Sequence, residues 1–337
     1  MPILQKIRWF LPLLGLTFSC QSPEEPTALP EKPLFEWTDP SFRVAYPGPY
    51  SEVDSSSYHL ASQALACLAD GRPEGIPFPL SDSVKISFCD WPITVVNAQE
   101  FQSFFKAWHG KHAEVRYEAF NVRAIFNEAY QTTVYFCFGR WQFHAVDGEV
   151  VDRYTTVLFS TDSTGSLTAV TEWAMCWPEN STLALTPDPN PTHFHFYCHP
   201  KPGSMEAAVR AVSTTQALFS LDREQMMQYL ADTVQFTPSC GLNTRWSKED
   251  LASSTQANDP FVGVDPISVI PFYQECQENH VILVFDYESF IEDGRLKRYS
   301  YLRTYILNRD LQIINILVQR RLVPNAINWH WQDARRG

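Results

Sequence analysis

The sequence predicts an α+β protein with two tandem domains, each with helices packed on one face of a curved, mainly antiparallel sheet. Three observations lead to this prediction. The chain has 337 residues, enough for about two domains. Hydrophobic residues make up 45% of it, which is sufficient for large cores. Short stretches of the first half recur in the same order in the second half, and each half contains the same series of helix-like and strand-like segments.

The N-terminus has the features of a secretion signal at residues 1–19. Two basic residues precede the apolar run Trp9–Phe18, which is too short to span a membrane. Cys20 follows a small residue, and this arrangement resembles a bacterial (Bacteroidetes-type) lipoprotein signal, in which the cysteine is lipidated. The resemblance implies a lipid anchor in the cell envelope, on the outer membrane, facing the periplasm or the surface. An ordinary signal peptide cleaved nearby is the alternative. Residues 20–45 begin with a Pro/Glu-rich stretch and are expected to be a tether and lead-in.

The net charge bears on possible partners, and the number of cysteines bears on disulfide pairing. The formal net charge is −12, and an acidic surface repels phosphate backbones, so we expect no nucleic-acid partner. Of eight cysteines, lipidation of Cys20 leaves seven (8 − 1), so at least one is unpaired or pairs between chains. Cys67 and Cys137 lie in apolar runs and are expected to be buried free thiols.

An internal repeat divides the chain. The matched stretches are 45–51 with 198–204, 63–68 with 216–221, 97–101 with 247–251, 127–138 with 274–285, and 147–160 with 293–308. The first match aligns Pro47 and Pro49 with Pro200 and Pro202. The last aligns Arg153 with Arg298, a pair expected to brace the sheet. Because the matches are collinear, we predict homologous domains. The boundaries are 46–180 for the first domain, 181–204 for the linker and lead-in, 205–325 for the second domain and 326–337 for the tail.

The elements of the first half follow from periodicity. Helical spacing and a closing glycine predict a helix over 55–71, which serines can cap. Asn97 and Glu100 form a capping-box pattern that begins a helix ending near Gly110. Strands are predicted at 83–90, 114–127, 132–145, 150–160 and 166–177.

The second half repeats this order. A long helix is predicted at 207–232, and a short helix at 247–256 has Ser247 and Asp250 as its capping pair. Strands are predicted at 233–238, 267–274, 280–291, 296–308 and 311–320.

This element order resembles the nuclear-transport-factor-2-like superfamily, which includes SnoaL-like polyketide cyclases and ketosteroid isomerases. The resemblance covers Ser55–Trp177 and Met205–Leu322. It implies two cone-shaped domains, each enclosing a pocket between helices and curved sheet. Related cones pair through the open sheet face, so an intramolecular pseudo-dimer is implied as well.

The resemblance also suggests where catalysis would occur. In ketosteroid isomerases the base follows the first strand, while a helix tyrosine and a late-strand acid hold the oxyanion. Asp90 occupies the position after the strand, and Trp91 beside it could desolvate the carboxylate and raise its pKa. Asp90 making a turn is the alternative. The oxyanion positions fall near Ala64 and near Thr155 and Thr156, which cannot supply those groups. The enzyme question stays open, and a non-catalytic protein is favoured.

Aromatic residues suggest a binding site instead. Trp91, Trp141, His144, Tyr154 and Trp173 could line an apolar pocket with a few polar groups, which is the usual composition of a ligand site. Their packing as ordinary core is the alternative. No cofactor is expected, because phosphate-loop, nucleophile-elbow, HExxH and paired CxxC motifs are missing from the sequence.

One histidine-rich stretch has residue types that bind zinc or copper, namely His193, His195, Cys198 and His199. The repeat places it over Phe42–Pro47, which has no histidine or cysteine. We therefore expect a structural lead-in without metal; a metal site is the alternative.

Taken together, the sequence predicts an envelope-anchored, non-catalytic protein whose two cone domains bind a small apolar ligand or another protein. One alternative is a SnoaL- or isomerase-type enzyme that uses Asp90 as general base in the first domain. The other is a structural accessory subunit of an envelope complex.

Overall fold

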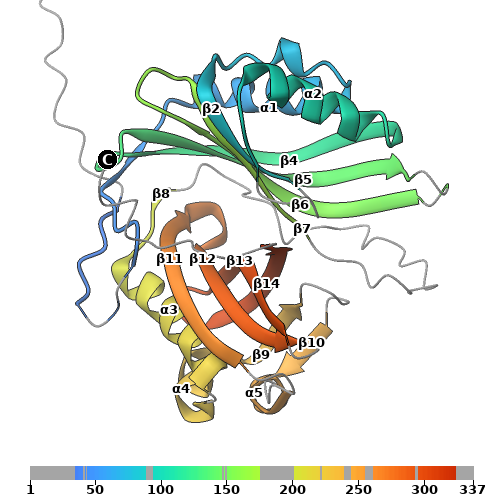
Figure 1. Ribbon diagram of the computed structural model, residues 1–337. Coiled ribbons are helices and arrows are strands. Elements are labelled where there is room, and N and C mark those ends of the chain that lie inside the picture. Colours follow the sequence, from blue (N-terminus) through green and yellow to red (C-terminus); the bar gives the residue numbers. More distant parts are fainter. Residues whose placement is uncertain are drawn as a thin grey trace, which may run out of the picture. The chain divides into compact units, whose positions relative to one another are not determined.

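A computed structural model describes residues 35–40, 42, 44–88, 94–145, 148, 150–174, 201–220, 222–238, 244–254, 261–292 and 295–323. Within these residues each half has helices lying on one face of a mainly antiparallel sheet, as Figure 1 shows. The predicted α+β class is confirmed. Cys20, Asp90, Trp91 and the histidine-rich stretch His193–His199 lie outside the described residues.

The first half contains β1 (Tyr50–Glu52), α1 (Tyr58–Ala69), β2 (Leu80–Ser87), β3 (Thr94–Val96), α2 (Ala98–His109), β4 (Ala113–Asn127), β5 (Thr132–His144), β6 (Val150–Thr161) and β7 (Leu167–Ala174). Short 3-10 turns lie at Ser55–Ser57 and Pro73–Gly75. The strand order is β3-β2-β7-β6-β5-β4-β1, and only the pairing of β2 with β7 is parallel. Helices α1 and α2 cover one face of this sheet (Figure 1).

The second half contains β8 (Lys201–Pro202), α3 (Met205–Ser220), α4 (Arg223–Tyr229), β9 (Leu230–Thr237), β10 (Thr244–Ser247), α5 (Lys248–Ser254), β11 (Phe261–Gln274), β12 (Asn279–Glu292), β13 (Arg295–Leu307) and β14 (Ile313–Leu322). A 3-10 turn covers Glu275–Gln277. The strand order β10-β9-β14-β13-β12-β11-β8 reproduces that of the first half, and again one pairing, β9 with β14, is parallel.

The register of the central hairpins repeats as well. Asn127 pairs with Thr132 at the end of the β4–β5 hairpin, and Gln274 pairs with Asn279 at the end of the β11–β12 hairpin. Each loop has four residues (128–131 and 275–278). Phe138 and Phe285 therefore hold the same strand position, six residues after the loop (138 − 132 and 285 − 279). The prediction that these two phenylalanines are equivalent is confirmed.

Two alignments of the repeat are wrong. Thr161 of β6 and Leu307 of β13 hold equivalent positions, because they pair with Thr133 and His280 next to the two hairpin loops. Counting back eight residues from each gives Arg153 in β6 and Tyr299 in β13, so Arg153 corresponds to Tyr299. Arg298 therefore lies on the opposite sheet face from the position of Arg153. The proline match is shifted by three residues, because Pro202 lies opposite Phe272 where the first half has Glu52 opposite Ile125. Sequence similarity in short turns did not preserve the register that strand pairing sets.

The short helices begin where the sequence predicted. Asn97 Oδ1 accepts hydrogen bonds from the backbone N–H of Gln99 and Glu100, each at 3.0 Å, and Glu100 Oε2 accepts one from the Asn97 N–H at 2.9 Å. This is a complete capping box. Ser247 Oγ accepts from the Asp250 N–H at 3.1 Å at the start of α5. Ahead of α1, Asp54 caps the 3-10 turn Ser55–Ser57 by accepting from the Ser56 N–H at 2.9 Å, whereas Ser57, the N-cap residue of α1, makes no side-chain cap hydrogen bond.

The predicted single helix at 207–232 is wrong. The chain forms α3, then a separate helix α4 capped by Asp222, whose Oδ1 accepts from the Gln225 N–H at 3.0 Å. Residues 230–232 already belong to β9. An aspartate side chain that satisfies free N–H groups starts a new helix, and it overrides the continuous apolar spacing that favoured one long helix.

Contacts also join the two halves. Ala174 of β7 pairs with Arg320 of β14 at a single register position, so the two sheets count as one. Two tandem domains predict strands that pair only within their own half, and this prediction is wrong at Ala174 and Arg320. Two side-chain hydrogen bonds lie nearby, from Thr156 Oγ1 to Gln319 Oε1 at 2.7 Å and from Trp173 Nε1 to Ser300 Oγ at 3.0 Å.

Three described cysteines can be placed. Cys67 and Cys137 are buried free thiols, as predicted. Cys276 is disulfide-bonded, and since the other two are free, its partner lies outside the described residues. Among the helices of the described chain, none combines the length and the hydropathy that a membrane crossing requires.

Candidate functional site in the second half

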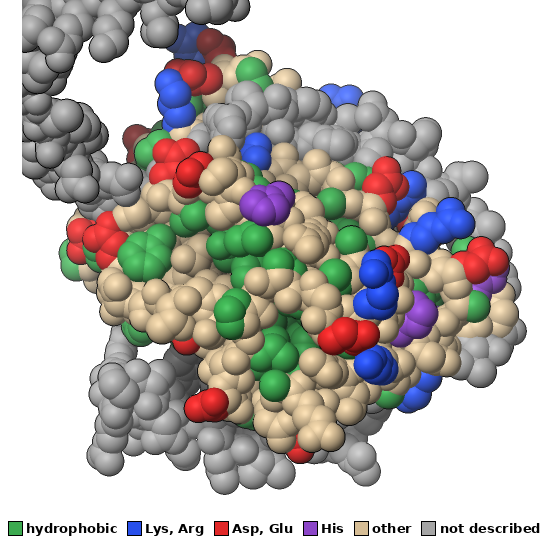
Figure 2. All heavy atoms as spheres, turned by 90° about the horizontal axis from the view of Figure 1, so that it is seen from above, with side chains coloured by type: hydrophobic (Ala, Val, Ile, Leu, Met, Phe, Trp, Pro, Cys, Tyr) green, Lys and Arg blue, Asp and Glu red, His purple; other side chains and the backbone are tan. Residues whose placement is uncertain are grey.

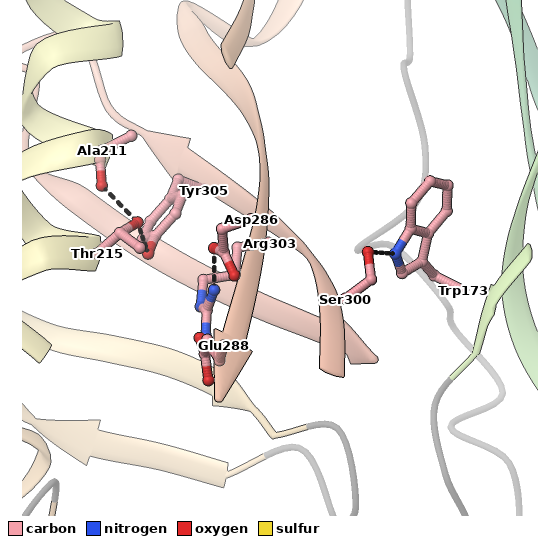
Figure 3. Close-up of polar contacts among 8 residues, drawn as sticks. All are labelled: Trp173, Ala211, Thr215, Asp286, Glu288, Ser300, Arg303 and Tyr305. Atoms are coloured by element: carbon pink, nitrogen blue, oxygen red, sulfur yellow. Dashed lines mark hydrogen bonds and ion pairs between the residues drawn. The ribbon is translucent and has the colours of Figure 1, made fainter. Parts of the chain in front are cut away.

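Alternation along β13 defines the two faces of the second sheet. The Tyr305 hydroxyl lies 2.6 Å from Thr215 Oγ1 on α3. Thr215 donates its own proton to the Ala211 carbonyl at 2.9 Å, so Tyr305 is the donor to Thr215. Odd-numbered residues of β13 therefore face the helices. Even-numbered residues face away, as Ser300 does in its contact with Trp173 (Figure 3).

Three charged side chains meet on the helix-facing side. Asp286 and Glu288 are two residues apart on β12 and so share a face, and Arg303 of β13 lies on that face too. Arg303 Nη1 donates to Asp286 Oδ2, and its Nη2 donates to Glu288 Oε1 (Figure 3). All three residues are buried, with exposed fractions of 0%, 1% and 4%. We call this set the second-half triad.

Burial and charge have opposite effects on the carboxyl groups of the second-half triad. Burial raises the pKa of Glu288 to about 8; Arg303 opposes the rise, while the neighbouring Asp286 adds to it. Burial also raises the pKa of Asp286, again against the charge of Arg303. The two carboxyl groups also hydrogen-bond to each other, and this bond lowers the pKa of Asp286 while it raises that of Glu288. Arg320 of β14 pairs with Tyr301 across the strands and places a second guanidinium on this face.

Aromatic rings surround the triad. The guanidinium of Arg303 lies over the ring of Tyr301, with its central carbon 4.6 Å from the ring centroid. Arg320 of β14 lies over Tyr299 at 4.9 Å in the same way. The ring of Phe290 packs edge-on against Tyr299 with centroids 6.1 Å apart. The faces of aromatic rings stabilise cations. The site therefore has aromatic rings next to a few fixed polar and charged groups.

The first half fills the same place with its own side chains. The register places Gly139, Trp141 and Val157 where the second half has Asp286, Glu288 and Arg303. Trp141 is fully buried and contacts the rings of Phe88, Trp108 and Tyr117 with centroid distances of 5.9, 5.2 and 4.6 Å. A Cβ at Gly139 would lie 2.6 Å from the Tyr117 hydroxyl, so the ring of Tyr117 occupies the space that a side chain would need there.

The described part of the first half contains a buried ion pair. Arg153 Nη2 and Glu172 Oε1 are 3.5 Å apart, with side chains 10% and 0% exposed. The charge of Glu172 also acts on Arg321 of β14, whose pKa it raises against the effect of burial. The view from above in Figure 2 shows acidic, basic and apolar side chains interspersed, without a patch of one charge.

The structure separates the five residues predicted to line a pocket. Trp141 faces the helices and is core. Tyr154 lies on the other face of the sheet. It pairs with Arg140 across the strands and packs against Phe120 with ring centroids 5.9 Å apart. Trp173 is on that face too, in contact with Ser300.

His144 lies on the same face as Tyr154, because Phe143 before it faces the helices. The His144 side chain is partly exposed, and its Nε2 lies 3.8 Å from Glu114 Oε2. The described members therefore do not line one pocket. The roles of Asp90 and Trp91 remain predictions.

Sequence reasoning missed the second-half triad, although a signal existed. Asp286 and Glu288 interrupt the apolar run "VILVFDYESF" at alternate positions, and Arg303 interrupts "YLRTYIL". Charges on one face of a mostly apolar strand indicate a buried polar cluster. Pairing partners 15 and 17 residues apart become visible only when the strand register is known. In the described part of the chain, no group of three or more His, Cys, Asp or Glu side chains could hold a metal ion.

Solved structures with a similar fold were found. A member of the NTF2-like family from Streptomyces avermitilis is 12% identical, with 36% of this chain and 96% of that chain covered and a TM-score of 0.30. An NTF2-like protein from Cytophaga hutchinsonii is 18% identical, covering 33% and 91%, with a TM-score of 0.26. A Mycobacterium tuberculosis protein solved with estradiol-17beta-hemisuccinate is 17% identical, covering 37% and 95%, with a TM-score of 0.25. At these values the likeness does not extend to function.

No family model matches the chain, and no curated protein matches it.

Proposed function

We propose that the second half binds a small, largely apolar molecule and that the chain is a non-catalytic binding protein of the cell envelope. The observation that carries this proposal is the second-half triad, a buried polar cluster among aromatic rings at a place that the first half fills with Trp141. Ligand sites have this makeup of apolar lining with few convergent polar groups.

The first half would then support the second. Its interior is filled by its own aromatic side chains, and its outer face contacts the second sheet through Thr156 and Trp173. One member of each contact is equivalent, because Trp173 and Gln319 hold the same place in β7 and β14, while their partners Ser300 and Thr156 are two residues from equivalence (156 corresponds to 302). This approximate reciprocity supports a tandem pair of NTF2-like domains packed as an intramolecular pseudo-dimer.

The envelope location rests on the N-terminal sequence and on one cysteine. Lipidation of Cys20 would tether the chain to a membrane. The disulfide at Cys276 fits an oxidising compartment, since disulfides persist there and are rare in the cytosol.

Proton transfer is a second candidate function, and one observation favours it. With a pKa of about 8, Glu288 can hold and release a proton near neutral pH, which suits a general acid or base. This chemistry would resemble that of isomerases and cyclases but would lie in the second half, away from Asp90. An isotope-exchange assay with a carbonyl substrate would detect it as loss of exchange in Glu288→Gln.

The binding proposal is tested with 4-fluorobenzyl alcohol, a small neutral apolar probe. We expect saturable broadening of its ¹⁹F signal with the full chain, at one site per chain. Glu288→Trp introduces the residue that the first half has at this position and should abolish the binding. Trp141→Phe in the first half is the matched control and should leave binding intact. Equal binding by the Glu288→Trp variant, folded by circular dichroism, would place the probe elsewhere and contradict the proposal.

A further inference from the structure

The disulfide at Cys276 has five possible partners in the sequence. Cys276 lies in the 3-10 turn Glu275–Gln277, within the loop of the β11–β12 hairpin. Cys67 and Cys137 are free thiols, so five of the seven other cysteines remain (7 − 2). These five are Cys20, Cys89, Cys176, Cys198 and Cys240.

The register of β8 with β11 favours one of the five. The two strands run antiparallel beside each other (Figure 1), and Lys201 lies opposite Tyr273. Three further steps along each chain lead to Cys198 and Cys276 (201 − 3 and 273 + 3). Directly opposed residues of an antiparallel pair have Cα atoms about 4.5–5.5 Å apart. A disulfide needs Cα atoms about 4.4–6.8 Å apart, so continuation of this register suits the bond.

Contacts on both sides of β8 support this register. Lys201 Nζ forms an ion pair with Glu275 Oε1, and Glu275 directly precedes Cys276. On the other side, the Gly203 N–H donates to the Pro271 carbonyl at 3.1 Å. The chain at β8 is therefore attached both to β11 and to the hairpin loop that contains Cys276.

The first half shows how the chain continues past the end of this ladder. Tyr50 of β1 lies opposite Asn127, and the next residues are in contact too, because the Glu128 N–H donates to the Pro49 carbonyl at 3.0 Å. Glu128 is the first residue of its four-residue hairpin loop, as Glu275 is in the second half. The segment before β1 thus follows the loop beyond the last strand pair, and we expect the segment before β8 to do the same.

The strand register excludes Cys176. Ala174 lies opposite Arg320, and the pairs across β13 and β12 continue from there to Asp286. Asp286 is ten residues from Cys276 along β12 (286 − 276), which is roughly 33 Å at 3.3 Å per residue. Cys176 is two residues beyond Ala174, and two residues extend a chain by at most about 7 Å.

Cys240 is excluded in the same way. Thr237 precedes it by three residues and is level, across β14 and β13, with Leu283 of β12. Leu283 is seven residues from Cys276 (283 − 276). Because β9 is parallel to β14, its continuation beyond Thr237 leads farther from the hairpin loop.

The remaining candidates are Cys89 and Cys20. Cys89 follows Phe88, which is fully buried against Trp108 on the helix-facing side of the first sheet. The second half contacts the other face of that sheet, where Trp173 bonds to Ser300. Lipidation would use the thiol of Cys20. Cys198 is the candidate that the register supports.

We propose that Cys198 and Cys276 form a disulfide, which ties the segment that joins the two halves to the first hairpin of the second half. Each thiol loses one proton and one electron, and a sulfur–sulfur bond forms. The electron pair passes by thiol–disulfide exchange to a disulfide oxidant, which is reduced to two thiols. The bond closes a loop that contains the second half from β8 to β11. Cys198 then has no thiolate to offer a metal, so the histidine-rich stretch loses its sulfur ligand.

Disulfide mapping of the full chain tests the assignment. The protein is incubated with glutathione disulfide, free thiols are blocked with iodoacetamide, and the chain is digested with trypsin and Glu-C protease for mass spectrometry. Cleavage after Glu179 separates Cys176 from Cys198. We expect a linked pair of peptides that contain Cys198 and Cys276 and that come apart on reduction. A link from Cys276 to any other cysteine, Cys20 included, or a Cys276 peptide without a linked partner, would overturn the proposal.

Stability provides a second readout. Loss of a crosslink that restricts the unfolded chain should lower the melting temperature by several degrees in Cys198→Ser and in Cys276→Ser. The double variant should melt with either single variant, because all three lack the same bond. Cys67→Ser removes a free thiol and is the matched control, whose shift should add to that of Cys198→Ser. Additive losses at positions 198 and 276, or losses that persist with a reductant present, would contradict the bond.

Discussion

Replacing Arg303 with methionine would remove the cation that two buried carboxyl groups share. Arg303 is 4% exposed and bonds to Asp286 and Glu288, which are 0% and 1% exposed. Removing one partner from a buried ion pair costs about 3–5 kcal/mol, because the remaining charge is left uncompensated. We expect Arg303→Met to lower the free energy of unfolding by that amount at pH 7, a large part of the roughly 5–15 kcal/mol of a typical protein.

The loss should depend on pH, with a sign that the structure determines. The pKa of Glu288 rises from 4.5 in the unfolded chain to about 8 in the folded protein. A raised carboxyl pKa stabilises the folded state at low pH, and this contribution disappears as the pH rises from 4.5 to about 8. One such group changes stability by at most about 1.4 kcal/mol per pH unit. Without Arg303 both carboxyl pKa values rise further, so the variant should regain stability relative to the unmodified protein at pH 5.

Urea unfolding at pH 5 and pH 7, followed by tryptophan fluorescence, measures both effects. Arg72→Met is the matched control, because Arg72 pairs with Asp70 while their side chains are 66% and 53% exposed, and an exposed pair contributes at most about 1 kcal/mol. The triple variant Arg303→Met, Asp286→Leu, Glu288→Met should recover most of the loss. A loss below about 1 kcal/mol for Arg303→Met, or the same loss at both pH values, would refute the reasoning.

Three further outcomes are expected. Asn97→Ala removes both cap hydrogen bonds to α2 and should cost about 1 kcal/mol in urea unfolding, whereas no loss would mean that the helix start is held by packing alone. Gly139→Ala places a Cβ 2.3 Å from the Glu118 carbonyl and should cost about 1–3 kcal/mol; an unchanged melting temperature would contradict the close packing. Intact-mass analysis of membrane-extracted protein should show diacylglyceryl mass on a chain that starts at Cys20, and a soluble form cleaved elsewhere would disprove lipidation.

Local signals in the sequence predicted much of the fold. The Asn97 capping box and the four-strand series of each half depend on neighbouring residues, so composition and spacing suffice to find them. The helix break at Asp222 was missed because an aspartate inside an apolar pattern has two interpretations, an exposed helical residue or a cap. Only the observed bond to Gln225 distinguishes them.

The candidate site was less accessible to sequence reasoning. Asp286, Glu288 and Arg303 come from two strands, and their contact depends on the register of β12 with β13. The same register placed Tyr154 and Trp173 on the face opposite Trp141, which aromatic content alone could not reveal. Side-chain direction alternates at every residue of a strand, so an error of one residue moves a side chain to the other face.

The repeated hairpin register has a consequence for the evolution of this protein. Because Phe138 and Phe285 hold the same position next to loops of equal length, the outward faces keep a common geometry. The inward positions are freer: Gly139 and Trp141 in one half correspond to Asp286 and Glu288 in the other. A mutation that alters one interior leaves the other half as an intact partner, so new ligand chemistry can arise in one half while the second preserves the scaffold.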